Sequence, residues 1–509
     1  MWSSTRPAIA RLVARIGFVL VLCLVAGGAG GLGEPVVAQS SADHFGRMFS
    51  NLPPFAPQNA KITEALVELG KRDGLMDAKD KLDEGPINLI VNPDLSKNNP
   101  NNDAHTAGAT FMGQFLDHDM TFDTTSRIGQ PANPRTTPNS RRPYFDLDSV
   151  YGDGPVGSPL RYEPGDRAKL RVESTGPFED LPRTESGTAV IADPRNDENL
   201  VISGLQAAFL LFHNRVVDHV REEHSDWETE DVFVAAKRLT TWHYQWMIVH
   251  EFLPAFVGAG MVNDVIANGC RFYRPENGDA FIPVEFQMVY RFGHSLVRPS
   301  YRANFTGNAG GPFFAMLFEN QSGSGEPSDL RGGFRSLRRF IGWQTFFRFP
   351  GFETDVRPNK RIDTKLSTPL FDLPLGAIAS GTPPTSLAAR NLLRHLTWKL
   401  PSGQQIAAAM GAPVLTSAQL ADLQSIYPPF VTSTPLWFYI LREADVMSDG
   451  AHLGPVGGRI VAEVFVGLLR ADQHSYVNQD PPFAPTLGPT PGAFSMIDFL
   501  RVAGVSAKR

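Results

Sequence analysis

Most apolar residues in this chain recur at the spacing of an amphipathic α-helix. Apolar positions three and four residues apart predict long helices over residues 205–223 and 232–251, because an α-helix has 3.6 residues per turn. Shorter helices are predicted over about residues 64–75, 107–120, 387–396, 417–427 and 458–471. Strand patterns are few and short. We therefore predict a mainly α protein with few short strands.

The segments between these helices have the composition of loops. Asn, Pro, Gly and Asp are crowded into residues 92–105 and 123–165, and residues 305–335 are rich in glycine. There is no internal repeat and no linker that would divide the body, so we expect one large domain. The expected parts are a signal peptide over residues 1–38, an arm and connecting segment over 39–95, the main domain over 96–475, and a Pro-rich extension over 476–509 that packs on the domain or trails from it.

The N-terminal residues have the pattern of a secretory signal peptide. Three arginines precede an apolar run over residues 17–27, and small residues lead up to Gln39. The alternative is a membrane anchor, because residues 16–33 are 18 uncharged residues, the lower limit for a span. Their second half is mostly glycine, which favours a cleaved signal. We expect a secreted or extracytoplasmic protein with no stable membrane span.

Composition excludes several classes of protein. Lys and Arg total 47 against 53 Asp and Glu, a net charge of -6, so no basic surplus is available to neutralise nucleic-acid phosphates. The two cysteines, Cys23 and Cys270, are too few for a disulfide scaffold or a four-cysteine zinc module. Neither the charge nor the composition indicates an oligomeric state.

The most informative motif is GQFLDHD at residues 113–119. On a helix, Gln114 and His118 lie about 40° apart, and Asp117 lies about 60° to the other side, so these three share a face. Asp119 points about 100° away from His118. One short helix can thus offer an imidazole and a carboxylate to one site and a second carboxylate to another. By itself the motif fits a solvated acidic helix end, or a zinc hydrolase, equally well.

Three further motifs are ambiguous when taken singly. YFDLDSVYG, at residues 144–152, carries aspartates at i and i+2, which suits calcium but also an ordinary Asp-rich turn. Arg195 and Glu198 lie one turn apart at a helix start, a spacing that is also typical of a surface ion pair. YRFGHSL, at residues 290–296, places His294 in an aromatic setting, where a core histidine bonded to the backbone is the more common case.

Together, and in this order, the four motifs resemble those of the animal haem peroxidase family. Softer matches extend the resemblance over about residues 100–475. They are residues 209–216, 244–254, 391–394 with Leu400 and Pro401, and 454–469. The resemblance implies a single large, mainly α haem peroxidase domain with few short strands.

The resemblance implies a role for each residue at the haem. His118 matches the distal histidine that moves a proton as H2O2 is cleaved, and Arg195 matches the distal arginine that stabilises developing negative charge. Gln114 matches a distal glutamine that holds water and lines the halide position. His294 matches the ligand of the haem iron, and Asn391 matches the asparagine that accepts the other ring N–H of that histidine.

Further residues match contacts to haem b. Arg291 and Arg394 stand at cofactor-binding positions of the family. Asp117 and Glu198 match two carboxylates that become ester-linked to the haem in some members, and both links are chemically feasible here. Asn199 stands where one member has a methionine that forms a sulfonium link. We therefore expect a less electron-poor haem, and donors such as bromide, iodide, thiocyanate or phenols rather than chloride.

A calcium site is also implied. Asp119, Asp146 and Asp148 match its carboxylate ligands, and the carbonyl oxygens of Arg142 and Tyr144 are further candidates. The family usually has threonine in place of Arg142 and serine in place of Asp148. One oxygen ligand is lost and one negative charge is gained, so a Ca²⁺ site is retained in this interpretation. Asp119 would tie the cation next to His118.

The implied activity is that of a secreted peroxidase that uses H2O2 to oxidise halides, pseudohalides or small organic donors. One alternative is a fatty-acid oxygenase of the same superfamily, whose radical tyrosine lies three residues before the proximal histidine. Here Arg291 holds that place and Tyr290 lies four before, which turns its side chain by about 100° on a helix. The other alternative is a secreted adhesion protein without activity. Against it, the four residues that the family's chemistry needs are all present: His118, Arg195, His294 and Asn391.

Overall fold

The computed structural model describes residues 44–175, 178–275, 279–306, 311–319, 326–333, 336–378 and 380–507. Residues 42–509 belong to one compact unit. The signal peptide that the sequence predicts over residues 1–38 lies outside the described residues.

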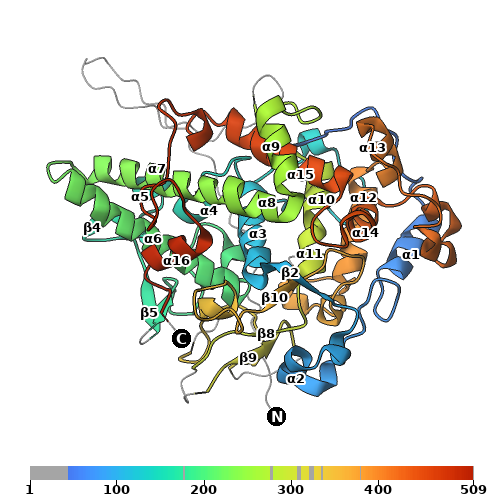
Figure 1. The fold of residues 1–509 in the computed structure, drawn as a ribbon, viewed down its shortest axis with the longest axis horizontal. Helices are drawn as coiled ribbons and strands as arrows, with labels where there is room; N and C mark the ends of the chain where they lie inside the picture. The colour runs from blue at the N-terminus through green and yellow to red at the C-terminus, as the bar shows by residue number, and fades with distance from the viewer. Residues whose placement is uncertain are drawn as a thin grey trace, which may run out of the picture. The chain divides into compact units, whose positions relative to one another are not determined.

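The described residues are mainly α-helical, as the sequence predicts (Figure 1). The α-helices are α1 (Ala60–Leu69), α2 (Gly85–Val91), α3 (Ala107–Met120), α4 (Asp148–Tyr151), α5 (Gly154–Gly157), α6 (Leu200–Glu223), α7 (Thr229–Met247), α8 (Leu253–Val257), α9 (Ala259–Asn268), α10 (Val284–Val289), α11 (Gly293–Leu296), α12 (Leu387–Trp398), α13 (Gly403–Met410), α14 (Leu436–Ser448), α15 (Pro455–Ala471) and α16 (Met496–Val502).

The strands of the described chain are short and pair only in twos. They are β1 (Phe45–Gly46), β2 (Asn101–Thr106), β3 (Tyr162–Glu163), β4 (Asp166–Leu170), β5 (Glu173–Thr175), β6 (Phe178–Asp180), β7 (Ile282–Pro283), β8 (Ser300–Arg302), β9 (Phe314–Met316) and β10 (Pro358–Lys360). β1 pairs with β7 in parallel, and the pairs β2–β10, β3–β4, β5–β6 and β8–β9 are antiparallel. The predicted fold class is therefore confirmed.

Three of the predicted helices differ clearly from the structure. The helix expected over residues 64–75 is α1, which starts earlier because the Asn59 side chain accepts a hydrogen bond from Ile62 N, and which ends at Gly70. The helix expected over residues 417–427 is only a 3₁₀ turn, Ala421–Ser425. Pro428 and Pro429 follow directly, and Tyr427 before them is extended, with φ of −158° and ψ of 107°, so an α-helix cannot continue to residue 427.

The helix predicted over residues 232–251 changes its winding before it ends. α7 stops at Met247, and a π-helical segment, Ile248–Phe252, joins it to α8. The wider turn sends Glu251 towards the N-terminus of α16, where its carboxylate accepts a hydrogen bond from Met496 N at 2.7 Å. Phe252, the next residue, lines the cavity described below.

α3 lies in the interior of the unit and contacts α4, α6, α11, β2 and β10 (Figure 1). It is buried on most sides, and its Phe115 stacks on Phe209 of α6 with ring centroids 4.6 Å apart. Gly108 lets the chain approach closely, because a Cβ atom there would lie 2.5 Å from the ring of Phe347. A helix enclosed in this way must find a partner for each polar side chain it carries.

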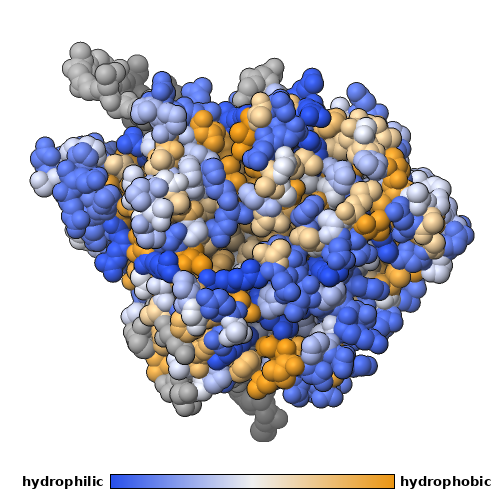
Figure 2. Space-filling model, viewed as in Figure 1, coloured by the Kyte–Doolittle hydropathy of each residue, from blue (hydrophilic) through white to orange (hydrophobic). Residues whose placement is uncertain are grey.

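α6 is the one helix of the described chain long and apolar enough to cross a membrane. However, 78% of its most apolar window is buried inside the unit, against α3, α7 and α16. Its Phe209 and Phe212 contact Phe499 of α16, with ring centroids 4.4 and 5.1 Å apart. On the face shown in Figure 2, hydrophilic side chains dominate and apolar areas are small. α6 is therefore a core helix of this unit.

Replacing Phe115 by Ala should destabilise the unit by about 3–5 kcal/mol, because it removes a fully buried ring that joins α3 to α6. The measurement is the free energy of unfolding in urea. Val156→Ala, at a side chain that is 92% exposed, is the control and should change stability by less than about 0.5 kcal/mol. Equal effects of the two substitutions would contradict this account of the core.

Candidate active site

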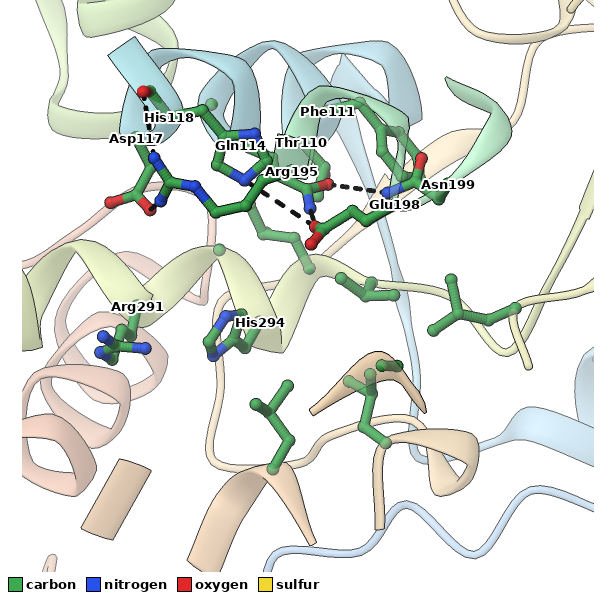
Figure 3. Close-up of a pocket in the computed structure, with 18 of the residues that line it drawn as sticks. Thr110, Phe111, Gln114, Asp117, His118, Arg195, Glu198, Asn199, Arg291 and His294 are labelled. Atoms are coloured by element: carbon green, nitrogen blue, oxygen red, sulfur yellow. Dashed lines mark hydrogen bonds and ion pairs between the residues drawn. The ribbon is translucent and has the colours of Figure 1, made fainter. Parts of the chain in front are cut away.

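A cavity of about 810 Å³ lies between α3 and the segment that leads into α11. This volume is within the range typical of cofactor and ligand sites. One wall comes from α3 and the 3₁₀ turn Pro194–Asp197, and the other from the 3₁₀ turn Tyr290–Phe292 and α11. Figure 3 shows His118 and His294 on opposite walls, with open space between them.

The α3 wall presents the side chains that the helical spacing predicts on one face. Gln114, Asp117 and His118 all line the cavity. Asp119 does not line it, and its carboxylate instead contacts the loop that carries Asp146 and Asp148. One helix therefore serves two sites on two of its faces.

His118 is a buried, neutral imidazole with a defined tautomer. Its Nδ1 lies 2.8 Å from Oδ1 of Asn196, whose amide nitrogen donates to Gln206. Because the Asn196 oxygen can only accept, Nδ1 carries the proton and Nε2 is left unprotonated. Burial, and then the charge of Arg195, lower the pKa of His118 to about 4. Nε2 is thus a free base at neutral pH.

Arg195 is held rigidly beside His118. Its Nε and Nη2 donate to Asp193 at 3.0 and 2.7 Å, and Nη2 also reaches the carbonyl oxygens of His118 and Thr121. The guanidinium lies over the ring of Phe122, 4.2 Å from its centroid. The charged partner of Arg195 is therefore Asp193, and the surface ion pair with Glu198 that the spacing allows does not form.

Glu198 belongs to a hydrogen-bonded chain of side chains at one end of the cavity. Gln114 Nε2 donates to Glu198 Oε1, and Asn199 Nδ2 donates to Gln114 Oε1 at 3.3 Å. Glu198 Oε1 lies 3.8 Å from Nε2 of His118. Its carboxylate is open to the cavity but enclosed by protein, and this burial raises the pKa of Glu198 to about 7.

His294 is a second neutral imidazole on the opposite wall. Burial, and then the charge of Arg291, lower its pKa to about 3. Its Nδ1 lies 2.7 Å from the side-chain amide of Asn391 on α12. An amide has the same outline after a 180° turn, so Asn391 can present its oxygen to a proton on Nδ1. Nε2 of His294 is then free to bind a metal ion that enters the cavity.

Two arginines on the same side of the cavity suit an anionic ligand. Arg291 is half-buried, and its buried Nε has no hydrogen-bond partner among the described residues. Loss of solvent around the guanidinium, and then the charge of Arg394, lower its pKa to about 10. Arg394 donates to Asp123 at 3.3 Å. A buried guanidinium beside a second one is costly unless negative charge arrives. The carboxylates of a cofactor would supply that charge.

The three predicted calcium ligands form one cluster. Single carboxylate oxygens of Asp119, Asp146 and Asp148 lie within 4.8 Å of one another. Burial, and then the charge of Asp146, raise the pKa of Asp119 to about 7 and raise that of Asp148 as well. Asp148 Oδ1 is buried without a hydrogen-bond partner. Both features fit a site for a hard cation.

Arg142 and Tyr144 lie in the loop beside this cluster. The carbonyl oxygen of Arg142 accepts a hydrogen bond from Tyr144 N at 2.8 Å, and a carbonyl oxygen keeps a second lone pair for a cation. The Arg142 guanidinium lies 2.7 Å from Asp146 and neutralises part of the negative charge. Leu147, with φ of 58°, bends the loop so that its N–H donates to Asp119.

The comparisons with known proteins agree with this geometry. The family model for the animal haem peroxidase matches residues 123–321, which include Arg195 and His294 but not His118. The chain is 30% identical over 116 residues to the dual oxidase of Drosophila melanogaster, which covers 22% of this chain and 7% of that protein. It is 23% identical over 381 residues to the chorion peroxidase of Aedes aegypti, covering 69% and 43%. The chain thus spans less than half of either relative.

Solved structures extend the likeness of the fold over nearly the whole chain. Peroxidase A from Dictyostelium discoideum superposes with a TM-score of 0.59 at 15% identity, covering 92% of this chain and 94% of that one. The fatty acid alpha-dioxygenase of Oryza sativa gives 0.59 at 16% identity, covering 92% and 80%. The fold is therefore like that of these two proteins. Over residues 123–321 the chain resembles the animal haem peroxidase family, as its motifs predict.

The sequence did not reveal every residue of the site. Asp193 and Asn196 flank Arg195 in the same motif, but nothing in their spacing indicates that they contact Arg195 and His118. Phe122, under the guanidinium, has no sequence pattern that marks it. The contacts of Asn196 with His118 and of Arg195 with Phe122 depend on the meeting of the Pro194–Asp197 turn with the end of α3.

We expect His118 to remain neutral well below the usual histidine range. In ligand-free protein with labelled histidines, its ring nitrogen resonances should not titrate until the pH nears 4, because burial and Arg195 both disfavour the cation. His118→Gln assigns the resonance. Arg195→Ala should raise the pKa of His118, and titration near 6.5 in the unmodified protein would contradict this picture.

Proposed function

We propose that this protein is a secreted haem peroxidase that uses H2O2 to oxidise small donors. One observation carries the proposal. A neutral imidazole with a free Nε2 and a fixed guanidinium line one wall of a cofactor-sized cavity, and a second neutral imidazole lines the other. This pairing is what heterolytic cleavage of a peroxide requires.

The residues present fit haem b. His294 would bind the iron through Nε2, with Asn391 accepting the proton on Nδ1 so that the tautomer is fixed. Arg291 and Arg394 would neutralise the two haem carboxylates, which explains the unpartnered Nε of Arg291. Asp117 and Glu198 face the cavity and are available for ester links. The bound haem supplies the iron that exchanges electrons with peroxide and with the donor.

His118 would move the proton. Its Nε2 accepts the proton of one oxygen atom of H2O2 and returns it to the other oxygen atom, which leaves as water. The low pKa of His118 favours the second step, because a buried imidazolium beside Arg195 gives up its proton readily. Arg195 stabilises the negative charge that develops on the oxygen atoms. The electrons come from the donor, which is oxidised as the peroxide is reduced.

The donor is proposed to be a halide other than chloride, a pseudohalide or a small organic molecule. Asn199 cannot form the sulfonium link of a methionine. Its side chain instead accepts hydrogen bonds from the first N–H groups of α6 and donates to Gln114. Gln114 is thereby held where it can bind a water or a small anion in the cavity.

A bound Ca²⁺ is proposed to be structural. It would join Asp119, next to His118 on α3, to the loop carrying Asp146 and Asp148. It would also remove the repulsion that raises the pKa values of Asp119 and Asp148. Carbonyl oxygens of Arg142 and Tyr144 would complete the oxygen ligands.

A fatty-acid oxygenase remains the second candidate. The supporting observations are the dioxygenase-like fold and the presence of Tyr290 in the cavity wall. However, the Tyr290 hydroxyl donates to the carbonyl oxygen of Gly113 at 3.0 Å, and Arg291 holds the position nearer the proximal histidine. The peroxidase interpretation accounts for Arg195 and His118 as well, so it is preferred. The alternative of an inactive adhesion protein does not explain why His118, Arg195 and His294 line one cavity.

His118→Ala should retain haem but react with H2O2 about 10²–10⁴-fold more slowly, since it removes the general acid–base group. His294→Ala should lose the haem absorbance. His474→Ala, at an exposed histidine, is the control and should behave as the unmodified protein. Loss of haem from His118→Ala, or oxygen uptake by the unmodified protein with linoleate and no peroxide, would overturn the assignment.

Ca²⁺ at about 100 times its Kd should raise the free energy of unfolding by about 2.7 kcal/mol, because it binds only the folded protein. Removal of Ca²⁺ with a chelator should reverse this gain in the free energy of unfolding. It should also change the haem spectrum, because Asp119 and His118 lie on the same helix, α3. Asp148→Asn should abolish the response, whereas Asp153→Asn, an exposed neighbour outside the cluster, should keep it. If Ca²⁺ changed neither the haem spectrum nor the melting temperature, the proposed link between the calcium site and the haem would be refuted.

A further inference from the structure

We propose that Asp193 is a positioning residue that aims the guanidinium of Arg195 into the cavity. The inference rests on the proposed peroxidase function, because it concerns the orientation of the distal arginine. Asp193 is fully buried and does not line the cavity. Asp193 therefore acts on the reaction through Arg195, through the turn that carries it, or through its charge, which raises the pKa of His118.

The carboxylate of Asp193 accepts three hydrogen bonds from Arg195. Its Oδ1 accepts hydrogen bonds from Nε at 3.0 Å and from the backbone N at 2.9 Å, and its Oδ2 accepts from Nη2 at 2.7 Å. A planar guanidinium bound along one edge by a carboxylate has its orientation fixed, because both groups are flat and the two bonds are parallel.

The other contacts of Arg195 leave one nitrogen for the cavity. Nη2 is also used by the carbonyl oxygens of His118 and Thr121, at 3.1 and 2.6 Å. Nη1 has no hydrogen-bond partner among the described residues, and Asp117 Oδ2 lies 3.9 Å away. The edge bound by Asp193 thus determines that Nη1 is the donor offered to a bound peroxide or anion.

A second arginine keeps this carboxylate from cancelling the charge of Arg195. Arg141 Nε donates to Asp193 Oδ2 at 2.8 Å, and Arg141 Nη2 donates to the carbonyl oxygen of Ala192. Two guanidiniums therefore share one carboxylate, and the trio keeps a net positive charge beside the cavity. The same two arginines hold the pKa of Asp193 well below its usual range, despite its burial.

Arg141 also connects this trio to the acidic cluster. Its Nη1 lies 3.9 Å from Oδ1 of Asp148, the oxygen without a hydrogen-bond partner. The chain of charges runs from Arg195 through Asp193 and Arg141 to Asp148. Both sides of α3 are thus linked by side chains outside the helix.

Asp193→Asn separates positioning from a purely structural role. Asparagine keeps the oxygen that accepts the backbone N–H of Arg195, so it preserves the start of the turn, but it replaces the second acceptor by an amide that repels Nη2. In the haem-loaded protein, we expect a normal haem spectrum and a second-order rate constant with H2O2 lowered on the order of 10- to 100-fold. Fluoride, which only accepts hydrogen bonds, should bind the ferric protein more weakly.

A double-mutant cycle tests whether the effect passes through Arg195. In the Arg195→Ala background, Asp193→Asn should change the peroxide rate and the fluoride Kd by no more than about twofold. The inference would be overturned if Asp193→Asn had the same effect with and without Arg195. It would also be overturned if Asp193→Asn alone left the rate constant with H2O2 unchanged. Asp166→Asn removes a carboxylate that binds Arg221 at two points, away from the cavity, and should leave both readouts unchanged.

A second variant and a second readout allow the positioning role and the proposed function to fail separately. If Asp193→Asn does not fold, Asp193→Glu keeps the charge but displaces the carboxylate, and it should lower the peroxide rate and weaken fluoride binding in the same direction. If the unmodified haem protein did not react with H2O2, the proposed function would be refuted but the positioning role would not. Fluoride binding would still report the orientation of Arg195. Unchanged fluoride binding in both Asp193 variants would refute the positioning role.

Discussion

The enclosure of α3 on nearly every side is the constraint on which the rest of the structure depends. A buried helix cannot leave a polar side chain unsatisfied, yet this one carries Gln114, Asp117, His118 and Asp119. One face therefore opens onto a cavity and the other onto a cluster of carboxylates. The low pKa of His118 and the raised pKa of Asp119 follow from the same burial, acting on groups of opposite charge.

The arginines around α3 balance this arrangement. Arg195 and Arg141 share Asp193 on the side of the distal wall, while Arg291 and Arg394 lie on the side of His294. Arg394 of the second pair donates to Asp123, whereas the Nε of Arg291 has no hydrogen-bond partner among the described residues. The positive charge of Arg291 favours an anionic ligand at that wall, which agrees with the proposed binding of haem carboxylates.

Local patterns predicted most of the fold and part of the site. The apolar spacing placed α3 at its observed bounds, and the angle between His118 and Asp119 separated the cavity from the carboxylate cluster. The helix expected over residues 417–427 was wrong, because the chain there forms turns and a short 3₁₀ segment and is extended at Tyr427, before Pro428. Asn196 was missed because its partner His118 lies 78 residues away in sequence. Asp193 was missed although Arg195 is only two residues away, because that spacing alone does not decide whether the two side chains meet.

The sequence by itself determined the mainly α class, the family resemblance and which residue types stand on each face of α3. Helical periodicity and motif spacing depend only on neighbours along the chain, so they can be recognised without coordinates. Only the tertiary structure decided that α3, the Pro194–Asp197 turn, α11 and α12 enclose one cavity. It also decided the tautomer of His118 and the aim of Arg195, because each follows from contacts between segments that meet only when the core packs.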